Sequence, residues 1–173
     1  MIYNFRKAKL SEISAIWSIL KDAILRRKED GSGQWQDGYP NPAVVANDIE
    51  KGQGFVLVKS SSIIGYCALI INDEPAYQAI EGKWITNDDF VVVHRLAVAT
   101  DYLRKGYAVR ILKEIELFAV QQDIHSVKAD TNFDNPAMIK IFDTLQYQYC
   151  GEVYFRGSPR KAYEKILTSL SDL

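Results

Sequence analysis

A strand-like run that leads into a basic, glycine-containing loop is the part of this chain best suited to chemistry. Residues 91–98 are mostly β-branched or apolar, and residues 103–106 read Leu-Arg-Lys-Gly immediately before a helical pattern begins. A helix N-terminus presents unpaired backbone N–H groups and a positive dipole end, which together bind anions. Arg104 and Lys105 add two cations, and Gly106 allows a ligand to approach the backbone closely. The pattern therefore predicts a site for a phosphate or pyrophosphate.

His94 is the residue of this run that is best suited to acid–base catalysis. It precedes Leu96 by two positions, so strand alternation would place both side chains on one face of the sheet. Histidine is also the side chain that most readily gains and loses a proton near neutral pH. Two interpretations stay open: His94 takes a proton from a substrate, or it packs structurally and hydrogen-bonds a neighbouring backbone group.

The run and its loop resemble the acetyl-CoA-binding core of the GNAT superfamily of N-acetyltransferases. Members of that family have an apolar strand that ends in a Leu-x-Val step, followed by a loop of the form (Gln/Arg)-x-x-Gly-x-(Gly/Ala). Here residues 96–98 match the step and residues 106–108 match the end of the loop, whereas Leu103 stands at the Gln/Arg position. If that position normally contributes a contact, backbone amides and Arg104 must suffice in this chain.

The resemblance implies that acetyl-CoA (CoA) is the cofactor. Its pantetheine arm would pair with the backbone of Leu96 and Val98 as if it were another strand, and its pyrophosphate would bind the N–H groups of residues 104–108. The reaction would be direct attack of a neutral amine on the thioester, with a base, an oxyanion donor and an acid for the leaving thiolate. The implied cofactor-binding residues of this stretch are Leu96, Ala97, Val98, Leu103, Arg104, Lys105, Gly106, Tyr107 and Ala108.

The resemblance also bears on the catalytic groups. Serotonin-acetylating members of the family carry a histidine where His94 stands, and Val92 replaces the acidic residue that some other members have. Many members supply the thiolate's proton from a tyrosine seven residues after the asparagine that opens the last helix, but Phe142 stands there. Several tyrosines follow in the next expected strand, and we take Tyr149 as the candidate acid.

A second segment, residues 135–147, resembles the family's Asn-x-x-Ala-x-x-Leu-Tyr-x-x-x-Gly-Phe pattern. Asn135 and Tyr147 match in place, whereas several positions between them depart from it. Asn135 could cap the helix that it opens or donate to the pantetheine amide. Phe142 could be ordinary core or pack on the cofactor's thioethyl arm. Both Asn135 and Phe142 are therefore candidate cofactor-binding residues.

Two aromatic-rich loops could hold the acetyl acceptor. Residues 34–40 follow the first expected helix and contain Trp35 and Tyr39, which we expect to bind the substrate. Residues 73–89 join two expected strands and contain Glu81 among other acidic residues. Connections of that length are often functional, and acidic residues beside aromatics suit a cationic amine, although loop acids are mostly solvated.

Charge and composition exclude several classes of function. The chain carries 21 basic and 22 acidic residues, a net charge of -1, which gives no general attraction to nucleic acid or to an anionic membrane. No apolar run is long enough to span a bilayer, and the first residues lack the apolar segment of a signal peptide. Cys67 and Cys150 are expected to be free thiols in the reducing cytoplasm. With 2 histidines and no Cys-x-x-Cys pair, no metal site is expected.

The hydrophobic pattern predicts one mixed α/β domain over residues 1–173. Apolar residues at helical spacing favour helices, and alternating runs favour strands. A β-α-β unit over residues 90–132 predicts two parallel neighbouring strands, and Ser11 is expected to cap the first helix. The domain should be a mixed central sheet of six to seven strands flanked by about four helices, which is also the GNAT arrangement. The expected strands are 3–7, 55–59, 63–71, 90–98, 126–132, 147–155 and 162–167, and the expected helices are 11–28, 41–50, 106–121 and 135–145.

These features predict an acetyl-CoA-dependent N-acetyltransferase that acetylates a primary amine of a small molecule or peptide. An alternative is a non-catalytic acyl-CoA-binding module of the same fold, which Leu103 and Phe142 at customarily polar positions favour. A third hypothesis is a protein that binds the phosphate of a nucleotide unrelated to CoA. The acceptor itself does not follow from the fold, because function depends on the site. The apolar C-terminal strand could pair with a second copy of the chain to form a homodimer.

Overall fold

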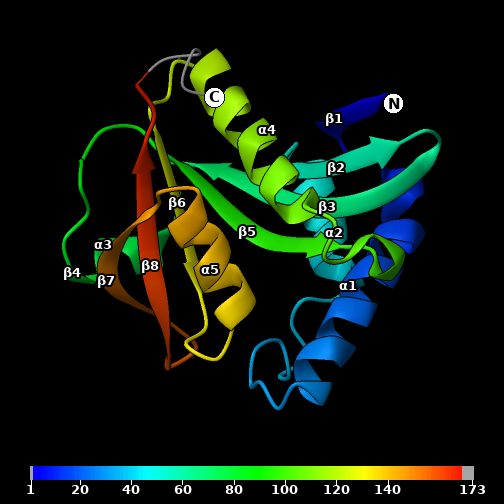
Figure 1. Cartoon of the computed structure of the whole chain (residues 1–173), viewed down its shortest axis with the longest axis horizontal. Coiled ribbons are helices and arrows are strands. Elements are labelled where there is room, and N and C mark those ends of the chain that lie inside the picture. The colour runs from blue at the N-terminus through cyan, green and yellow to red at the C-terminus, as the bar shows by residue number, and fades with distance from the viewer. Residues whose placement is uncertain (1, 169–173) are drawn as a thin grey trace. The chain divides into compact units, whose positions relative to one another are not determined.

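The protein has a mixed α/β fold, which a computed structural model describes over residues 2–168 (Figure 1). In chain order its strands, α-helices and 3-10 helices (η) are β1 (Tyr3–Lys7), η1 (Leu10–Glu12), α1 (Ile13–Glu29), α2 (Pro42–Glu50), β2 (Gly54–Lys59), β3 (Ser62–Ile71), α3 (Pro75–Gln78), β4 (Glu81–Gly82), β5 (Val91–Val98), η2 (Thr100–Tyr102), α4 (Tyr107–Gln121), β6 (Ser126–Thr131), α5 (Pro136–Thr144), β7 (Gln148–Phe155) and β8 (Ser158–Ile166). The strand order in the sheet is β1-β2-β3-β5-β6-β8-β7-β4. The predicted fold class is confirmed, with 8 strands among the described residues rather than six or seven.

The chain divides into two compact units. Unit 1 comprises residues 1–69 and 95–111, and unit 2 comprises residues 70–94 and 112–173. β3, β5 and α4 each contribute residues to both units. The expectation of a single domain over residues 1–173 stays a prediction.

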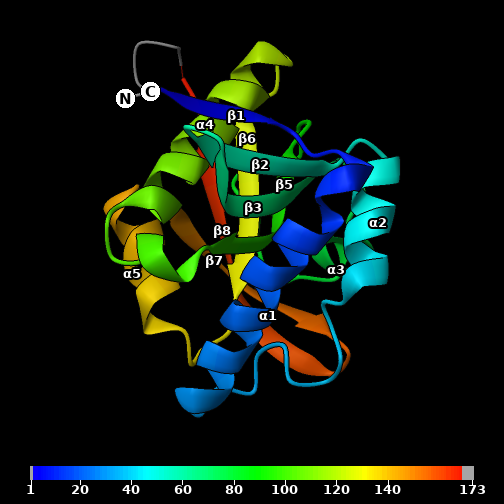
Figure 2. The ribbon, with the colours of Figure 1, turned by 90° about the vertical axis from the view of Figure 1, so that its right-hand side faces the viewer.

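In unit 1, two helices pack against antiparallel strands. β2 pairs with β1 and with β3 in antiparallel fashion, and β2 and β3 are successive strands of the chain. α1 and α2 lie side by side and contact each other (Figure 2). Ile16 and Leu20 of α1, which recur at helical spacing, are fully buried in one cluster with Val56 and Tyr66 of the strands. The apolar residues whose helical spacing predicted this helix are therefore the ones that fill the core.

In unit 2, the strands combine one parallel pair with several antiparallel pairs. β6 runs parallel to β5, with Val93 opposite Ala129, as the β-α-β pattern predicted. β8 lies antiparallel to both β6 and β7, and the short β4 pairs with β7. One hydrophobic cluster of this unit consists of Tyr77, Val92, Val153 and Ala162, with partly buried hydrophobic residues packed against it.

The start of the first helix differs from the prediction. Ser11, expected as the N-cap, lies inside η1, and α1 begins at Ile13. The Glu12 carboxylate accepts a hydrogen bond from the Lys9 backbone N–H at 2.8 Å and pairs with the Arg6 guanidinium at 2.7 Å. The Glu12 carboxylate therefore satisfies the backbone N–H of Lys9, the N-cap residue of η1, and α1 continues from η1 without a side-chain cap of its own.

Residues 73–89, expected as one long loop, contain α3 and β4. The Glu74 side chain caps α3 by accepting from the Ala76 backbone N–H at 3.4 Å, and a proline occupies the first helical position. β4 pairs where Gly82 and Gly151 meet, and a Cβ at Gly82 would lie 2.2 Å from the Cys150 carbonyl oxygen. These contacts are non-local, so the local pattern did not reveal them. β8 also begins at Ser158, four residues earlier than expected.

The two cysteines are free thiols, as expected. Cys67 is buried and Cys150 is partly buried. Burial raises the pKa of both thiols, which makes them weak nucleophiles near neutral pH. Within residues 2–168, no helix is both long enough and apolar enough to cross a membrane.

We predict that Glu12→Gln destabilises the fold by about 1 kcal/mol near neutral pH. The hydrogen bond from Arg6 lowers the pKa of Glu12, although partial burial works in the opposite direction. A lowered pKa means that the carboxylate contributes stability above its ordinary titration range and loses it as the pH falls through the folded-state pKa. Urea unfolding at about pH 7 and about pH 3 should therefore show a wild-type advantage that shrinks at the lower pH. Glu29→Gln, at an exposed position, is the control, and an equal advantage at both pH values would contradict the prediction.

Candidate active site

β5 contains a residue in a conformation that strands rarely adopt. Arg95 has φ 55°, in the left-handed region, between residues with extended backbone. A non-glycine residue there costs about 1–2 kcal/mol and kinks the strand locally. Strand alternation therefore does not extend across Arg95, and the prediction that placed His94 and Leu96 on one face loses its basis.

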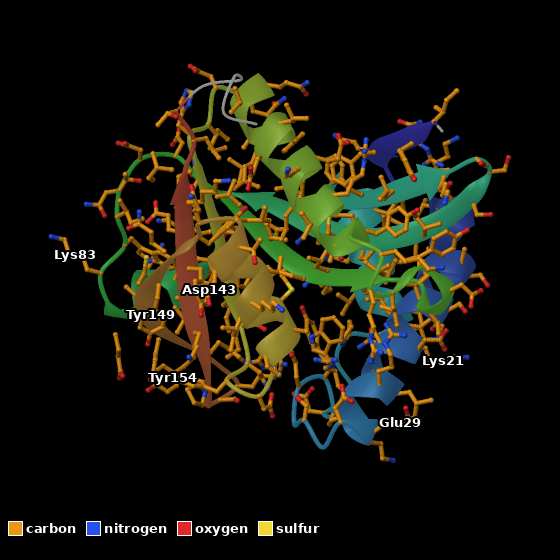
Figure 3. The ribbon with its side chains drawn as sticks, in the orientation of Figure 1. Lys21, Glu29, Lys83, Asp143, Tyr149 and Tyr154 are labelled. Atoms are coloured by element: carbon orange, nitrogen blue, oxygen red, sulfur yellow. The ribbon has the colours of Figure 1, made fainter. Side chains whose placement is uncertain are left out.

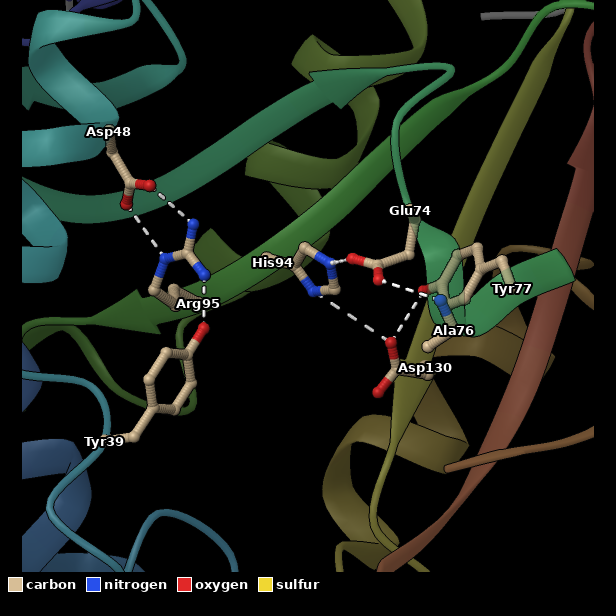
Figure 4. A network of polar contacts seen from close by, with 8 residues as sticks. All are labelled: Tyr39, Asp48, Glu74, Ala76, Tyr77, His94, Arg95 and Asp130. Atoms are coloured by element: carbon tan, nitrogen blue, oxygen red, sulfur yellow. Dashed lines mark hydrogen bonds and ion pairs between the residues drawn. The ribbon is translucent and has the colours of Figure 1, made fainter. Parts of the chain in front are cut away.

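A buried ion pair in unit 1 holds the Arg95 side chain (Figure 4). Its Nε lies 2.9 Å and one terminal nitrogen 2.6 Å from the two oxygens of Asp48. Asp48 also accepts the Tyr66 hydroxyl at 2.6 Å, and the Tyr39 hydroxyl accepts from the other Arg95 terminal nitrogen. Burial opposes the charge of Arg95, but Tyr39 and Asp48 raise its pKa above the ordinary value. This fork geometry is the strongest form of arginine–carboxylate pairing.

His94 lies between two carboxylates in unit 2 (Figure 4). Its Nε2 is 2.6 Å from Glu74 Oε2, and its Nδ1 is 4.0 Å from Asp130 Oδ1. The Tyr77 hydroxyl donates to the same Asp130 oxygen at 2.6 Å. The ring of His94 also meets the edge of the Phe155 ring, with centroids 5.8 Å apart. The imidazole is therefore contacted by side chains from three elements: α3 with its N-cap residue, β6 and β7.

Two carboxylates flank the imidazole of His94 at low solvent exposure. The side chains of His94, Glu74 and Asp130 are only 15%, 12% and 7% exposed, so water screens them weakly. Burial raises the pKa of Asp130, while His94 and the Tyr77 hydrogen bond work in the opposite direction. Among residues 2–168, no group of three or more such side chains has an arrangement that would hold a metal ion. The cluster is suited to moving and holding a proton.

Sequence reasoning selected His94 and missed its three partners. Glu74 and Tyr77 lie in the segment that was expected to be an acceptor loop, and Asp130 lies inside a strand. The register that places Ala129 opposite Val93 brings Asp130 next to His94. Only the pairing register of β5 and β6 identifies Asp130 as a neighbour of His94, and a single sequence does not contain that register.

The loop between η2 and α4, in unit 1, has the geometry of an anion site. Arg104 and Gly106 both have positive φ, 58° and 81°, and residues 104–106 are exposed. The Arg110 N–H bonds to the Gly106 carbonyl at 3.0 Å, so the N–H groups in the first turn of α4 precede the helical hydrogen-bond ladder. A Cβ placed on Gly106 would meet nothing within 4 Å, which leaves room for a ligand beside the backbone. These residues fit a pyrophosphate.

Some predicted cofactor-binding residues have partners of their own in unit 1. The Val98 carbonyl accepts from the Arg26 guanidinium at 3.2 Å, and the Lys105 ammonium donates to the Asp101 carbonyl at 2.8 Å. The Tyr107 hydroxyl accepts from the Lys59 ammonium at 2.9 Å, and that bond lowers the pKa of Tyr107. Ala97 and Val98 are buried, whereas Leu96, Leu103, Tyr107 and Ala108 are partly exposed.

The other three predicted site residues of unit 2 are a helix cap, a core residue and an exposed strand residue. Asn135 caps α5 by accepting from the Met138 N–H at 3.3 Å. Phe142 is 2% exposed, and its ring lies 4.8 Å from that of Tyr163, so it belongs to the core. Tyr149 is an exposed residue of β7 (Figure 3), and its ring lies 5.8 Å from Tyr163. The described contacts of Tyr149 do not link it to His94.

The two predicted substrate-binding residues have different surroundings. Trp35 lines an open pocket of about 410 Å³ together with Trp17, Lys21 and neighbouring residues of the segment that follows α1. Tyr39 instead supports the Arg95 side chain through its hydroxyl. Of the two, Trp35 is therefore the one that lines a pocket.

Comparison with known proteins identifies the family to which this chain belongs. The model of the acetyltransferase (GNAT) family matches residues 17–146. This match covers most of the chain, so the chain belongs to the GNAT family of acetyltransferases. The family uses acetyl-CoA, which is accordingly the cofactor of this protein.

Solved structures share the fold. A GNAT-family acetyltransferase from Streptococcus agalactiae is 32% identical, with 96% of each chain covered and a TM-score of 0.89. One from Listeria monocytogenes is 17% identical over 95% of each chain, with a TM-score of 0.77. The protein yncA from Salmonella typhimurium, solved with its cofactor acetyl-CoA, is 15% identical over 98% of this chain and 96% of its own, with a TM-score of 0.70. The latter two show the fold alone. A comparison with curated proteins found no match.

We predict that Asp48→Asn destabilises the protein by about 3–5 kcal/mol, because it leaves the Arg95 charge buried without its carboxylate. Tyr66→Phe, which removes only one hydrogen bond to Asp48, should cost about 1 kcal/mol. Guanidinium unfolding of both variants measures the difference. A loss below about 1 kcal/mol for Asp48→Asn would show that the pair does not hold the strand.

Proposed function

We propose that this protein is an N-acetyltransferase that transfers the acetyl group of acetyl-CoA to a primary amine of a small molecule or peptide by direct attack. The observation that carries the proposal is the position of His94 between Glu74 and Asp130. A histidine flanked by carboxylates can take a proton from an approaching amine, and the carboxylates stabilise the charge that results. The free thiols Cys67 and Cys150 support a location in the reducing cytoplasm.

The loop before α4 is the proposed holder of the cofactor's pyrophosphate. The backbone N–H groups of residues 104–108 would bind its oxygens, with the exposed Arg104 as a nearby cation. Bound acetyl-CoA supplies the thioester carbonyl that an amine can attack. Leu103, at the position where the family has Gln or Arg, contributes no polar group, so the backbone carries this role.

A thiol-release assay tests the proposal. Purified protein with acetyl-CoA is offered a panel of polyamines, aromatic amines, aminoglycosides and peptides with free N-termini, and free CoA thiol is measured. Release in proportion to one amine, with the acetylated product seen by mass spectrometry, is the expected result. Calorimetric binding of acetyl-CoA without release for any amine would favour the alternative, a non-catalytic acyl-CoA-binding module.

We predict that His94→Ala lowers kcat by about 100-fold or more, the usual scale of positioned general-base catalysis. The acid limb of the pH–rate profile should disappear, because the group that must lose its proton is gone. His125→Ala is the matched control, since His125 is 50% exposed and contacts only Leu167 and Asp123 among its described partners. If His94 only packs against its neighbours, His94→Ala would instead give a less stable protein whose folded fraction keeps its turnover and the acid limb of its pH–rate profile.

We predict that Gly106→Val weakens acetyl-CoA binding by about tenfold or more, because the new side chain enters the space beside the helix N-terminus and strains the loop. Gly157→Val is the matched control. Gly157 has φ 75°, close to the 81° of Gly106, and a Cβ there also meets nothing within 4 Å. Both variants should lose similar stability, but calorimetry should show weaker acetyl-CoA binding only for Gly106→Val. Equal affinities would remove the loop from the cofactor site.

A further inference from the structure

We propose that the gap between His94 Nδ1 and Asp130 Oδ1 receives the acceptor's amine nitrogen as a primary ammonium group. In this proposal Asp130 is a substrate-binding residue. Glu74 is a positioning residue that decides which nitrogen of His94 accepts the proton. The inference rests on the proposed function, because it names the atoms that would recognise the amine.

Glu74 determines the tautomer of His94. A carboxylate only accepts hydrogen bonds, so the contact of 2.6 Å between Glu74 Oε2 and His94 Nε2 places a proton on Nε2. The other oxygen of Glu74 accepts from the Ala76 N–H at the start of α3, which fixes the direction of the carboxylate. In the neutral imidazole, Nδ1 is then the nitrogen with the lone pair.

The distance between Nδ1 and Asp130 suits a bridging donor. At 4.0 Å the two atoms are too far apart for a hydrogen bond, and both are acceptors when His94 is neutral. A single atom with two hydrogens, about 2.8–3.0 Å from each, can donate to both. The Tyr77 hydroxyl donates to the same Asp130 oxygen at 2.6 Å and so fixes where that oxygen lies.

The charge of the cluster selects a cation for this position. Glu74 and Asp130 lie on opposite sides of one imidazole, and all three side chains are largely buried. An ammonium group is compensated there by the carboxylate of Asp130, which lies 4.0 Å from His94 Nδ1. An alcohol or thiol has one hydrogen to donate and no charge, so it cannot satisfy both acceptors.

The proton step balances without a further reagent. One N–H bond of the ammonium breaks and an Nδ1–H bond forms, so a positive charge moves from the amine to the imidazole. Glu74 stabilises the imidazolium through Nε2–H, and the amine, now neutral with a free lone pair, stays hydrogen-bonded to Asp130. In this step Glu74 therefore stabilises the imidazolium, whereas Asp130 holds the amine.

Nitrogen-15 NMR of the imidazole tests the role of Glu74. In a His125→Ala background, His94 is the single histidine of the chain. We expect the Nε2–H tautomer in that background, loss of the preference in Glu74→Ala, and partial recovery in Glu74→Gln, which keeps an acceptor oxygen. An Nδ1–H tautomer, or a preference unchanged in Glu74→Ala, would overturn the assignment.

Titration with methylammonium chloride, followed at the same nitrogen, tests the role of Asp130. We expect a saturable shift of Nδ1 with methylammonium, none with methanol, and binding weaker by about tenfold or more in Asp130→Asn. Tyr77→Phe, which removes a hydrogen bond to Asp130 without changing charge, should weaken binding less, and circular dichroism confirms that each variant is folded. No shift, or equal shifts with methanol, would overturn the proposal.

The N-acetyltransferase activity and the amine-binding site at Asp130 can be rejected independently of each other. Thiol release decides whether the protein is an N-acetyltransferase, whereas the NMR titration uses neither acetyl-CoA nor turnover. A saturable methylammonium site without thiol release would uphold the amine subsite and reject the proposed function. Thiol release with no methylammonium site would uphold the proposed N-acetyltransferase activity and reject Asp130 as the amine-binding residue.

Discussion

The buried pair of Arg95 and Asp48 holds β5 in a conformation that an arginine in a strand does not adopt by itself. Both partners are nearly inaccessible, with side-chain exposures of 8% and 2%. Their bidentate contact, with Tyr66 and Tyr39 as further partners, offsets the cost of a left-handed residue and of two desolvated charges. His94 immediately precedes Arg95 in β5, and η2 and the basic loop before α4 follow it along the chain.

A second buried carboxylate secures the segment that supplies Glu74. Glu164 is fully buried and accepts the Ile85 N–H at 2.6 Å, the Thr86 hydroxyl at 3.0 Å and the Ser126 hydroxyl at 2.7 Å. Such a charge is tolerable because hydrogen bonds replace its lost hydration. The segment that was expected to be an acceptor loop is therefore tied to the strands of unit 2 at residues 85 and 86.

The two halves of the proposed chemistry differ in how they are encoded. The anion loop is contiguous: a strand end, two cations, a glycine with positive φ and a helix start lie within a short stretch. The proton-handling cluster is assembled from residues 74, 77, 94 and 130, which only strand register and a short capped helix bring together. Tyr149, chosen because many family members have a tyrosine acid, is 55% exposed and packs on Tyr163, and its role as the acid stays a prediction.

The sequence by itself determined the mixed α/β class, most element boundaries, the Asn-Pro helix starts, the family resemblance and the loop before α4. Those features depend on periodicity, capping and turn chemistry, which act between residues close along the chain. The tertiary structure alone decided that the Glu12 carboxylate caps η1, that Phe142 is core, that Asp48 pairs with Arg95, and that Glu74 and Asp130 flank His94. Charges far apart in sequence become partners only when register and burial fix their distances, and no local pattern records that.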